Sequence, residues 1–290
     1  MRDLYAQGEL AERVSVVIPA RNEALNLPYV LDALPAGLHE VILVDGHSVD
    51  GTVEVARQIR PDIKIIHQGR RGKGNALACG FAAVTGDIIV MLDADGSADP
   101  DEIATFVAAL ASGADFAKGT RFSKGGSSHD ITRLRRLGNA ALNGLVNRLF
   151  STDYTDLCYG YNAFRAFLLP VLDLPPVHSP GVSADAMRWG DGFEIETLIN
   201  VRMAHAGVSI TEVGSTERAR LHGVSNLRAF PDGLRVLRTV LAERRQPIRM
   251  DCIASTNHVP VNRPVTNQVP VKLPITNQVP VKADLVEEPR

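Results

Sequence analysis

The chain has 290 residues, of which 45% are hydrophobic and 22% are charged, and its formal net charge is −2 at pH 7. This length and apolar content suit an enzyme of one large or two small domains, whereas the balanced charge argues against a protein whose whole surface binds nucleic acid. Three scattered cysteines argue against a disulfide scaffold or zinc site, the N-terminus lacks the apolar centre of a secretory signal, and no apolar run predicts a membrane span.

The chain from Val14 to about Gly119 alternates short β-branched runs with longer amphipathic stretches. We expect strands at 14–18, 41–44, 63–67 and 88–92, and helices at 25–34, 51–59 and 74–84. Strands that alternate with helices in this way form a mainly parallel sheet that is covered by helices on both faces. The sequence therefore predicts an α/β fold for this region.

The rest of the chain has a different pattern. From about Thr120 to Arg249 loops and helices predominate, with a further strand expected at 208–213. Near the end of the chain, a Thr-Asn-(His or Gln)-Val-Pro-Val repeat begins at Thr256, Thr266 and Thr276. Regularly spaced prolines support neither a helix nor an internal strand, so we expect an extended, disordered tail.

The run Ile88–Ser97 places Asp93 and Asp95 at the end of an expected strand. Side chains at positions i and i+2 of an extended chain point to the same side, so the two carboxylates can face one ion. Their oxygens suit a hard divalent cation, Mg²⁺ or Mn²⁺, which takes its remaining ligands from the phosphates of a substrate. The alternative is a simple turn in which Asp99 caps the next helix.

Polar residues also follow the first two expected strands, and ligands of α/β sheets bind beyond the carboxyl ends of strands. After the first strand, a rigid turn at Pro19 presents Arg21 and Glu23 to a polar ligand. After Val44 in the second strand, Asp45 can accept hydrogen bonds from a base or a ribose. Each signal alone has a simpler interpretation, because Asp and Pro are ordinary turn residues.

A glycine-rich basic segment, Gly69–Ala76, lies between the third and fourth expected strands. Its glycines permit a close approach of the backbone, and its cations, Lys73 among them, can attract a diphosphate. A basic loop is also often simply solvated. The joint order of these motifs along one chain, rather than any one of them, favours nucleotide binding.

In this order the motifs resemble those of the inverting family 2 glycosyltransferases with the GT-A fold. The matching segments are Pro19–Glu23, Val44–Thr52, Gly72–Ala76, Leu92–Asp95 and Gly119–Phe122. Within this family the chain resembles the dolichyl-phosphate or polyprenyl-phosphate mannosyl- and glucosyltransferase branch in three later segments, Asp156–Tyr161, Gly192–Glu196 and Arg220–Leu227. The resemblance covers about Val14 to Phe230.

Three departures from the family pattern leave the sugar and the acceptor open. Gly46 stands where a second acidic residue often follows Asp45. Ser97 stands where the mannosyltransferase branch often has Gln after the metal-binding pair. The segment Asp156–Tyr161 also lacks the usual Thr-Ser pair before its glycine.

The resemblance implies a single displacement that moves a hexose from a nucleotide sugar, GDP-mannose or UDP-glucose, to a polyprenyl phosphate. It implies that Mg²⁺ or Mn²⁺ binds Asp93 and Asp95 and neutralises the leaving diphosphate. Arg121 and Arg220 would contact phosphates through their planar donor forks. The implied contacts to the nucleotide sugar are Pro19, Arg21, Glu23, Val44, Asp45, Lys73, Asp93, Ala94 and Asp95.

The class of the acceptor decides whether a base is needed. A lipid phosphate is already anionic near neutral pH and needs little help. A hydroxyl acceptor, on a saccharide, a secondary metabolite or a cell-wall glycan, must lose a proton, and Asp191 or Glu194 is then the candidate base. The alternative for both carboxylates is a cap of the helix expected at 195–206.

The segment from Ile131 to Thr152 combines arginines with leucines at helical spacing and contains no acidic residue. A basic amphipathic helix of this kind is typical of a membrane interface, and a second basic stretch runs from Arg235 to Arg249. Packing of the apolar stripe on the sheet is the alternative. We expect a cytoplasmic protein that associates peripherally with the inner face of the cytoplasmic membrane, where a lipid-phosphate acceptor would lie.

Other functions can be weighed against the same motifs. A nucleotidyltransferase would carry a glycine-rich, arginine-containing signature after the first strand, and Pro19–Glu23 is not one. A processive polysaccharide synthase would need a Gln-x-x-Arg-Trp segment and membrane helices, which the sequence does not show. A non-catalytic nucleotide-sugar-binding protein stays open, and metal-dependent turnover would exclude it.

These patterns divide the chain into three parts. The first is a short, polar N-terminal extension, and the last is the repeat-containing tail. The central part is a GT-A domain with a nucleotide-binding half and an acceptor half. The expected bounds are 1–13 for the extension, 14–250 for the domain with halves at about 14–119 and 120–250, and 251–290 for the tail.

Overall fold

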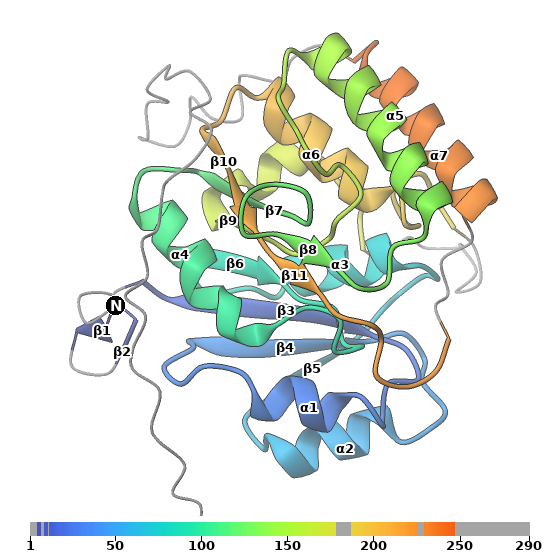
Figure 1. The fold of residues 1–290 in the computed structure, drawn as a ribbon. Helices are drawn as coiled ribbons and strands as arrows, with labels where there is room; N and C mark the ends of the chain where they lie inside the picture. Colours follow the sequence, from blue (N-terminus) through green and yellow to red (C-terminus); the bar gives the residue numbers. More distant parts are fainter. Residues whose placement is uncertain (1–4, 7–8, 11, 178–186, 225–228, 247–290) are drawn as a thin grey trace, which may run out of the picture.

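The computed structural model describes residues 5–6, 9–10, 12–177, 187–224 and 229–246. Its centre is a seven-stranded sheet (Figure 1) in the order β10 (Ile210–Gly214), β7 (Phe116–Thr120), β9 (Asn162–Arg165), β6 (Ile88–Met91), β3 (Val14–Ala20), β4 (Glu40–Asp45) and β5 (Lys64–His67). Neighbouring strands are parallel, apart from β9, which runs antiparallel to both β6 and β7. The expected α/β fold with a mainly parallel sheet is therefore confirmed.

Two small sheets flank this centre. The first is the antiparallel pair β1 (Tyr5–Ala6) and β2 (Glu9–Leu10), which falls within the predicted N-terminal extension. The second is the parallel pair β8 (Ser127–Ser128) and β11 (Thr216–Glu217). The tail predicted at 251–290 lies outside the described residues.

Helices cover both faces of the sheet, as expected (Figure 1). One face packs against α1 (Leu27–Asp32), α2 (Thr52–Ile59) and α4 (Ile103–Ala111). The other face packs against α3 (Lys73–Phe81) and α6 (Ile195–His205), over which α5 (Arg133–Phe150) and α7 (Ala229–Glu243) lie side by side. Short 3₁₀ turns occur at η2 (Pro100–Glu102) and η3 (Ala166–Leu172).

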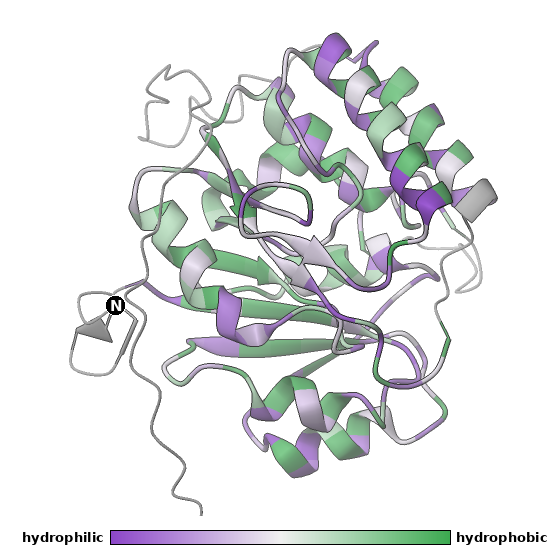
Figure 2. Cartoon of the chain, in the orientation of Figure 1, coloured by the Kyte–Doolittle hydropathy of each residue, from purple (hydrophilic) through white to green (hydrophobic). Residues whose placement is uncertain are grey.

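The central strands are apolar on both faces because helices bury them from both sides. Every residue of β6 is buried, and β3 is buried except at Pro19. Figure 2 shows the apolar residues gathered along these strands. Their carboxyl ends emerge at one edge of the sheet, where Asp93 and Asp95 follow β6 and Arg21 follows β3.

The sequence does not predict β7 or β9, and both have a physical reason. In β7 the apolar run is interrupted by Lys118, which is nevertheless fully buried. Its ammonium donates to the carbonyl oxygens of Gly119 at 2.5 Å and Tyr159 at 3.0 Å, and burial lowers its pKa. The four residues of β9 begin with Asn162 and end with Arg165, so the run is too short and too polar to stand out.

The inner face of α5 combines buried asparagines with apolar residues such as Val146. Asn139, Asn143 and Asn147 lie one turn apart and bond the backbone of the segment 154–158. Asn143, for example, donates to the carbonyl oxygen of Thr155 at 2.6 Å and accepts from the amide of Leu157 at 2.7 Å. The leucine stripe divides: Leu142, Leu145 and Leu149 pack against the core, as in the alternative of packing, whereas Leu134 and Leu137 are exposed. Among the described helices, none is long and apolar enough to cross a bilayer.

Candidate active site

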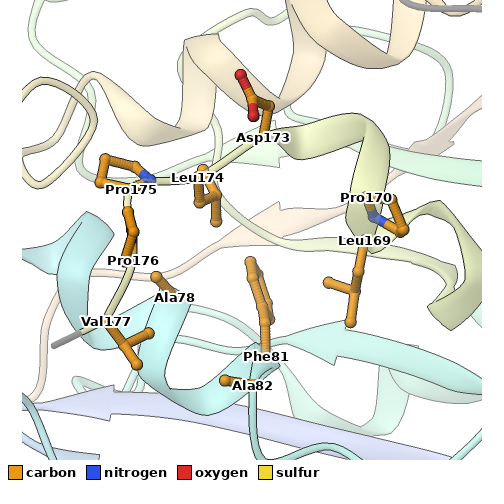
Figure 3. Close-up of a pocket in the computed structure, with 10 residues that line it drawn as sticks. All are labelled: Ala78, Phe81, Ala82, Leu169, Pro170, Asp173, Leu174, Pro175, Pro176 and Val177. Carbon is orange, nitrogen blue, oxygen red and sulfur yellow. The ribbon is translucent and has the colours of Figure 1, made fainter. Parts of the chain in front are cut away.

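The structure contains two sizeable hollows of different character. One, of about 610 Å³, lies between α3 and the segment 169–177, and its lining is apolar except for Asp173 (Figure 3). The other is a cleft of about 540 Å³ beyond the carboxyl ends of β3 and β6, where ligands of α/β sheets bind. Its charged lining residues include Arg21, Glu23, Arg71, Lys73, Asp93, Asp95, Arg121, Glu196 and Arg220.

Lys73, the first residue of α3, joins two carboxylates across the cleft. Its ammonium lies 2.7 Å from an oxygen of Asp93 and 2.6 Å from an oxygen of Glu196. Burial alone would lower the pKa of Lys73, but Asp93 and Glu196 outweigh burial and raise this pKa above its usual value. Burial raises the pKa of Glu196, and Lys73 offsets part of that rise. Lys73 is therefore a permanent cation in the cleft.

Arg220 makes the corresponding link on the other side of the cleft. It lies after β11, and its guanidinium donates to Asp95 at 3.2 Å and to Glu23 at 2.5 Å. The second oxygen of Glu23 accepts from the amide of Asn26 at 2.6 Å. Burial raises the pKa of Glu23, and the hydrogen bonds from Arg220 and Asn26 oppose that rise. Residues far apart in the sequence thus meet at the ends of β3 and β6.

Asp93 and Asp95 both line the cleft, as the two-residue spacing predicts. Their side chains are 37% and 23% exposed, so a ligand can reach both carboxylates. Among the described residues, no group of three or more His, Cys, Asp or Glu side chains could hold a metal ion. A cation bound by these two carboxylates alone would keep positions for phosphate oxygens and water, an arrangement that suits Mg²⁺ or Mn²⁺. The capping turn that was the alternative to a metal site is also formed. The side chain of Asp99 accepts a hydrogen bond from the backbone amide of Asp101 at 3.2 Å.

Arg121 lies at the cleft but is already paired. It follows β7, is 5% exposed, and donates to Asp156 at 2.7 and 2.9 Å and to Glu217 at 3.0 Å. Burial would lower the pKa of Arg121, but these two carboxylates raise it. Its charge is thus neutralised within the protein, and its guanidinium also stacks 5.0 Å from the ring of Tyr159. The arrangement fits a residue that supports the cleft rather than a free phosphate ligand.

The two predicted bases lie next to the cleft but are not among its lining residues. Asp191 is 1% exposed and binds Arg70 with both oxygens at 2.8 Å. Glu194 is 4% exposed, and one of its oxygens accepts from the amides of Gly190 and Gly192 at 3.1 and 3.2 Å. Asp191 and one oxygen of Glu194 thus hold the turn that precedes α6, while the other oxygen of Glu194, Oε2, is buried without a hydrogen-bond partner in the described part of the chain.

Of the remaining residues predicted to contact the nucleotide sugar, some line the cleft and others are buried outside its lining. Pro19, Arg21 and Ala94 line the cleft. Val44 is fully buried in the core under α3. The carboxylate of Asp45 is buried, accepts from the amide of Ser48 at 3.2 Å and lies 3.3 Å from the ring of His67. Neither Val44 nor Asp45 is among the residues that line the cleft.

Several charged residues of the cleft are not among the predicted site residues, and two of them, Arg71 and Glu196, lie closest in sequence to predicted motifs. Arg71 lies within the glycine-rich segment, is exposed and lines the cleft beside Lys73. Glu196 ends the Gly192–Glu196 match and is the carboxylate of that segment that lines the cleft. The sequence contains a signal for Glu196, because it is the second residue of α6 and the helix residues after it are mostly apolar, so a carboxylate there indicates a buried group that needs a partner.

Comparison with known proteins agrees with this geometry. The family described as glycosyl transferase family 2 matches residues 15–172. The polyprenol monophosphomannose synthase of Mycolicibacterium smegmatis is 30% identical over 226 residues, which cover 74% of this chain and 81% of that protein. The undecaprenyl-phosphate mannosyltransferase of Micrococcus luteus is 30% identical over 251 residues, which cover 82% of this chain and 98% of that protein.

A solved structure shares the fold. The glucosyl-3-phosphoglycerate synthase from Mycobacterium tuberculosis, in complex with Mn²⁺, uridine diphosphate and phosphoglyceric acid, superposes with a TM-score of 0.61. It is 23% identical, and the similarity covers 82% of this chain and 80% of that one. The family match and the two long alignments show that this protein belongs to glycosyltransferase family 2 and is a glycosyltransferase.

Proposed function

We propose that the enzyme is a metal-dependent, inverting hexosyltransferase that moves a sugar from GDP-mannose or UDP-glucose to a polyprenyl phosphate. The observation that carries this proposal is a single cleft in which Asp93 and Asp95 lie beside the cations Lys73 and Arg220. Two relatives, a polyprenol monophosphomannose synthase and an undecaprenyl-phosphate mannosyltransferase, support polyprenyl phosphate as the acceptor.

Asp93 and Asp95 are the residues that would hold Mg²⁺ or Mn²⁺. Each ionised carboxylate has about four lone-pair positions, so its bonds to Lys73 or Arg220 leave room for an ion. When bound there, the ion would neutralise charge that builds on the leaving diphosphate. The solved structure that contains both Mn²⁺ and uridine diphosphate supports this assignment.

Cations of the protein would bind and orient the donor. Lys73 uses two of its three N–H groups on Asp93 and Glu196, so the third can donate to a phosphate oxygen. Arg71, exposed at the same wall, and Arg220 can reach the diphosphate from either side. Arg21 and Pro19 at the end of β3 line the part of the cleft that is left for the nucleoside.

The transfer itself is a single displacement. An oxygen of the acceptor phosphate attacks the anomeric carbon on the face opposite the diphosphate, and the bond from that carbon to the diphosphate oxygen breaks. Its electron pair leaves with the nucleoside diphosphate, and the configuration at the carbon inverts. The acceptor phosphate is anionic near neutral pH, so no base has to lie in the cleft, and the positions of Asp191 and Glu194 agree with that.

The acceptor would approach from the side of α5 and α7. Arg135 of α5 and Arg235 of α7 line the cleft, so the two helices border its mouth. Their outer surface is apolar and basic. Its exposed side chains include Arg133, Leu134, Arg136, Leu137, Leu234, Arg238 and Leu241.

No carboxylate is exposed on α5 or on the described part of α7, because Asp232 and Glu243 are buried. A surface of leucines and arginines without carboxylates fits an interface with anionic lipid. We therefore propose that this surface, Arg133–Leu137 and Leu234–Leu241, docks the enzyme on the membrane that holds the acceptor. The peripheral membrane association expected from the sequence thus remains part of this proposal.

The test is transfer of labelled sugar from GDP-mannose and from UDP-glucose to a polyprenyl phosphate with Mg²⁺ or Mn²⁺. Asp95→Ala removes one metal ligand, so we expect it to lower the rate by about 100-fold or more. Asp101→Ala is the matched control, because Asp101 follows the same strand but is exposed and outside the cleft lining. The control should keep the rate of the unmodified enzyme.

Other outcomes would redirect the proposal. Donor hydrolysis that depends on metal, without lipid product, would contradict the lipid acceptor and favour a hydroxyl acceptor. Transfer to phosphoglyceric acid would instead give this enzyme the acceptor that is bound in the solved structure. Nucleotide binding without any turnover would favour a non-catalytic binding protein.

A further inference from the structure

Arg70 is a buried arginine that joins three segments of the chain beside the cleft. Its side chain is 2% exposed and donates to both oxygens of Asp191 at 2.8 Å. It also donates to the carbonyl oxygens of Pro176 at 2.7 Å and Val177 at 3.2 Å, residues that border the apolar hollow (Figure 3). The amide of Arg70 itself donates to Asn75 at 2.7 Å, which closes the glycine-rich segment on itself.

The backbone of Asp191 completes the connection. Its carbonyl oxygen accepts from the amide of Gly74 at 2.8 Å, so side chain and backbone of Asp191 both hold the segment 69–75. The two segments touch without room for side chains. A Cβ on Gly72 would lie 2.1 Å from the carbonyl oxygen of Asp191, and one on Gly74 would lie 1.8 Å from that of Gly190. A shift of Asp191 must therefore move the backbone on both sides of Lys73.

We infer that Arg70 and Asp191 are positioning residues for Lys73, and that their ion pair fixes where the cleft presents its cation to the donor diphosphate. Lys73 lies between the two glycines that contact Asp191, and its partner Glu196 follows Asp191 on the entry to α6. The Arg70–Asp191 pair thus sets both ends of the Lys73–Glu196 contact. This inference rests on the proposed donor site, because it assigns Lys73 to the diphosphate.

The chain offers a matched control for a merely structural role. Arg202 on α6 binds both oxygens of Glu243 on α7 at 2.9 Å, and it also donates to the carbonyl oxygens of Leu172 and Asp173. Glu243 is buried and the side chain of Arg202 is 15% exposed; Arg202 has the same kind of partners as Arg70, but the pair lies outside the cleft lining. Glu243→Gln therefore repeats the chemical change of Asp191→Asn at a site that does not touch the donor.

The experiment is a double-mutant cycle on the full chain, with calorimetric titration of GDP and UDP in the presence of Mn²⁺. We expect Asp191→Asn to weaken nucleotide affinity by about tenfold in the unmodified protein and by less than about twofold in a Lys73→Met background, as for residues that act through one another. Glu243→Gln should change the affinity by less than about twofold. Equal losses from Asp191→Asn in both backgrounds, or an equal loss from Glu243→Gln, would overturn the inference.

A second measurement does not depend on nucleotide binding. The single tryptophan of the chain, Trp189, is 43% exposed and lies in the same turn as Asp191. We expect Asp191→Asn to increase acrylamide quenching of its fluorescence, and Glu243→Gln to leave the quenching unchanged. Unchanged quenching in Asp191→Asn would overturn the inference even if neither nucleotide binds, whereas failure of the unmodified protein to bind either nucleotide would contradict only the proposed donor site.

Discussion

Gly160 lies beneath the ion pair of Lys73 and Glu196 at the wall of the cleft. A Cβ at this position would lie 2.4 Å from an oxygen of Glu196 and 3.2 Å from the ammonium of Lys73. Both side chains are largely buried, so Glu196 has little space into which it could retreat. The absence of a side chain at Gly160 is therefore what allows a carboxylate and an ammonium to meet at this point.

Gly160→Ala tests that dependence. We expect the rate of sugar transfer to fall by about tenfold, because the displaced Glu196 moves Lys73 away from the diphosphate, while the fold is kept. The matched control is Gly144→Ala in α5, where a Cβ would meet nothing within 4 Å. That change should keep activity and raise stability by roughly 0.5–1 kcal/mol, the ordinary gain of Ala over Gly in a helix. Transfer rates and thermal unfolding measure both, and full activity of Gly160→Ala would contradict the role given to this contact.

A buried network of ion pairs around Arg121 joins separate elements of the fold. It connects the end of β7 to Asp156 in the segment after α5 and to Glu217 in β11. Asn139 of α5 also donates to Asp156 at 3.0 Å. Burial would raise the pKa of Asp156, but the hydrogen bonds and charge of Arg121 outweigh burial and hold this pKa below its usual value. The ionised form of Asp156 therefore stabilises the fold.

Asp156→Asn leaves Arg121 with an incomplete set of partners, so we expect it to lower the free energy of unfolding at pH 7 by about 3 kcal/mol. Because the pKa of Asp156 is lowered on folding, its contribution is present above the unfolded pKa of about 3.9 and is lost as the pH falls below it. The stability difference between the variant and the unmodified protein should therefore narrow below about pH 4. Urea unfolding at several pH values checks this, with the exposed Asp153→Asn as control. A difference that does not change with pH would contradict the account.

The proposed membrane surface on α5 and α7 can be tested by comparing two leucines of similar exposure. Leu137 on α5 is 70% exposed, and Leu25 near α1 is 69% exposed, far from that surface in the sequence. We expect Leu137→Glu to reduce sedimentation with phosphatidylglycerol vesicles by about tenfold, the order expected when one buried leucine side chain is lost. Leu25→Glu should bind as the unmodified protein does. Binding should also weaken with added salt, because arginines contribute to it. Equal binding by both variants would contradict the assignment of this surface.

For the molecule as a whole, local pattern predicted five of the seven strands of the central sheet, including β10 near the expected 208–213, and missed only β7 and β9. The strands β3, β4 and β6 are recognisable because burial on both faces makes their sequences apolar, and the edge strand β5 is recognisable by its two isoleucines. The pair Asp93 and Asp95 is recognisable because two carboxylates directly follow an apolar strand, although Asp95 lies in a turn rather than in the strand.

The part of the site that was not predicted depends on partners far away in the sequence. Asp191 has the sequence environment of a possible base, yet its partner Arg70 lies 121 residues earlier. Arg121 has the sequence environment of a phosphate ligand, yet Glu217 lies 96 residues later. Whether a charged residue stabilises the fold or takes part in catalysis depends on the residues with which it pairs. No local sequence motif contains that information.

The position of β9 affects how the chain folds during its synthesis and which parts of its gene could be exchanged. Residues 162–165 lie between β6 and β7, although both of those strands come earlier in the chain. A ribosome that has released only residues 14–119 would leave the edge of β6 without its neighbour, and an unpaired edge recruits other strands. The strands β6 and β7 are joined only when residue 165 has emerged, and the sheet is complete only with β10 at 210–214. We therefore expect that residues 14–119 and 120–250 would not fold as separately expressed fragments. A gene fusion that exchanged residues 120–250 alone would also exchange β9 and β10, two strands of the same sheet.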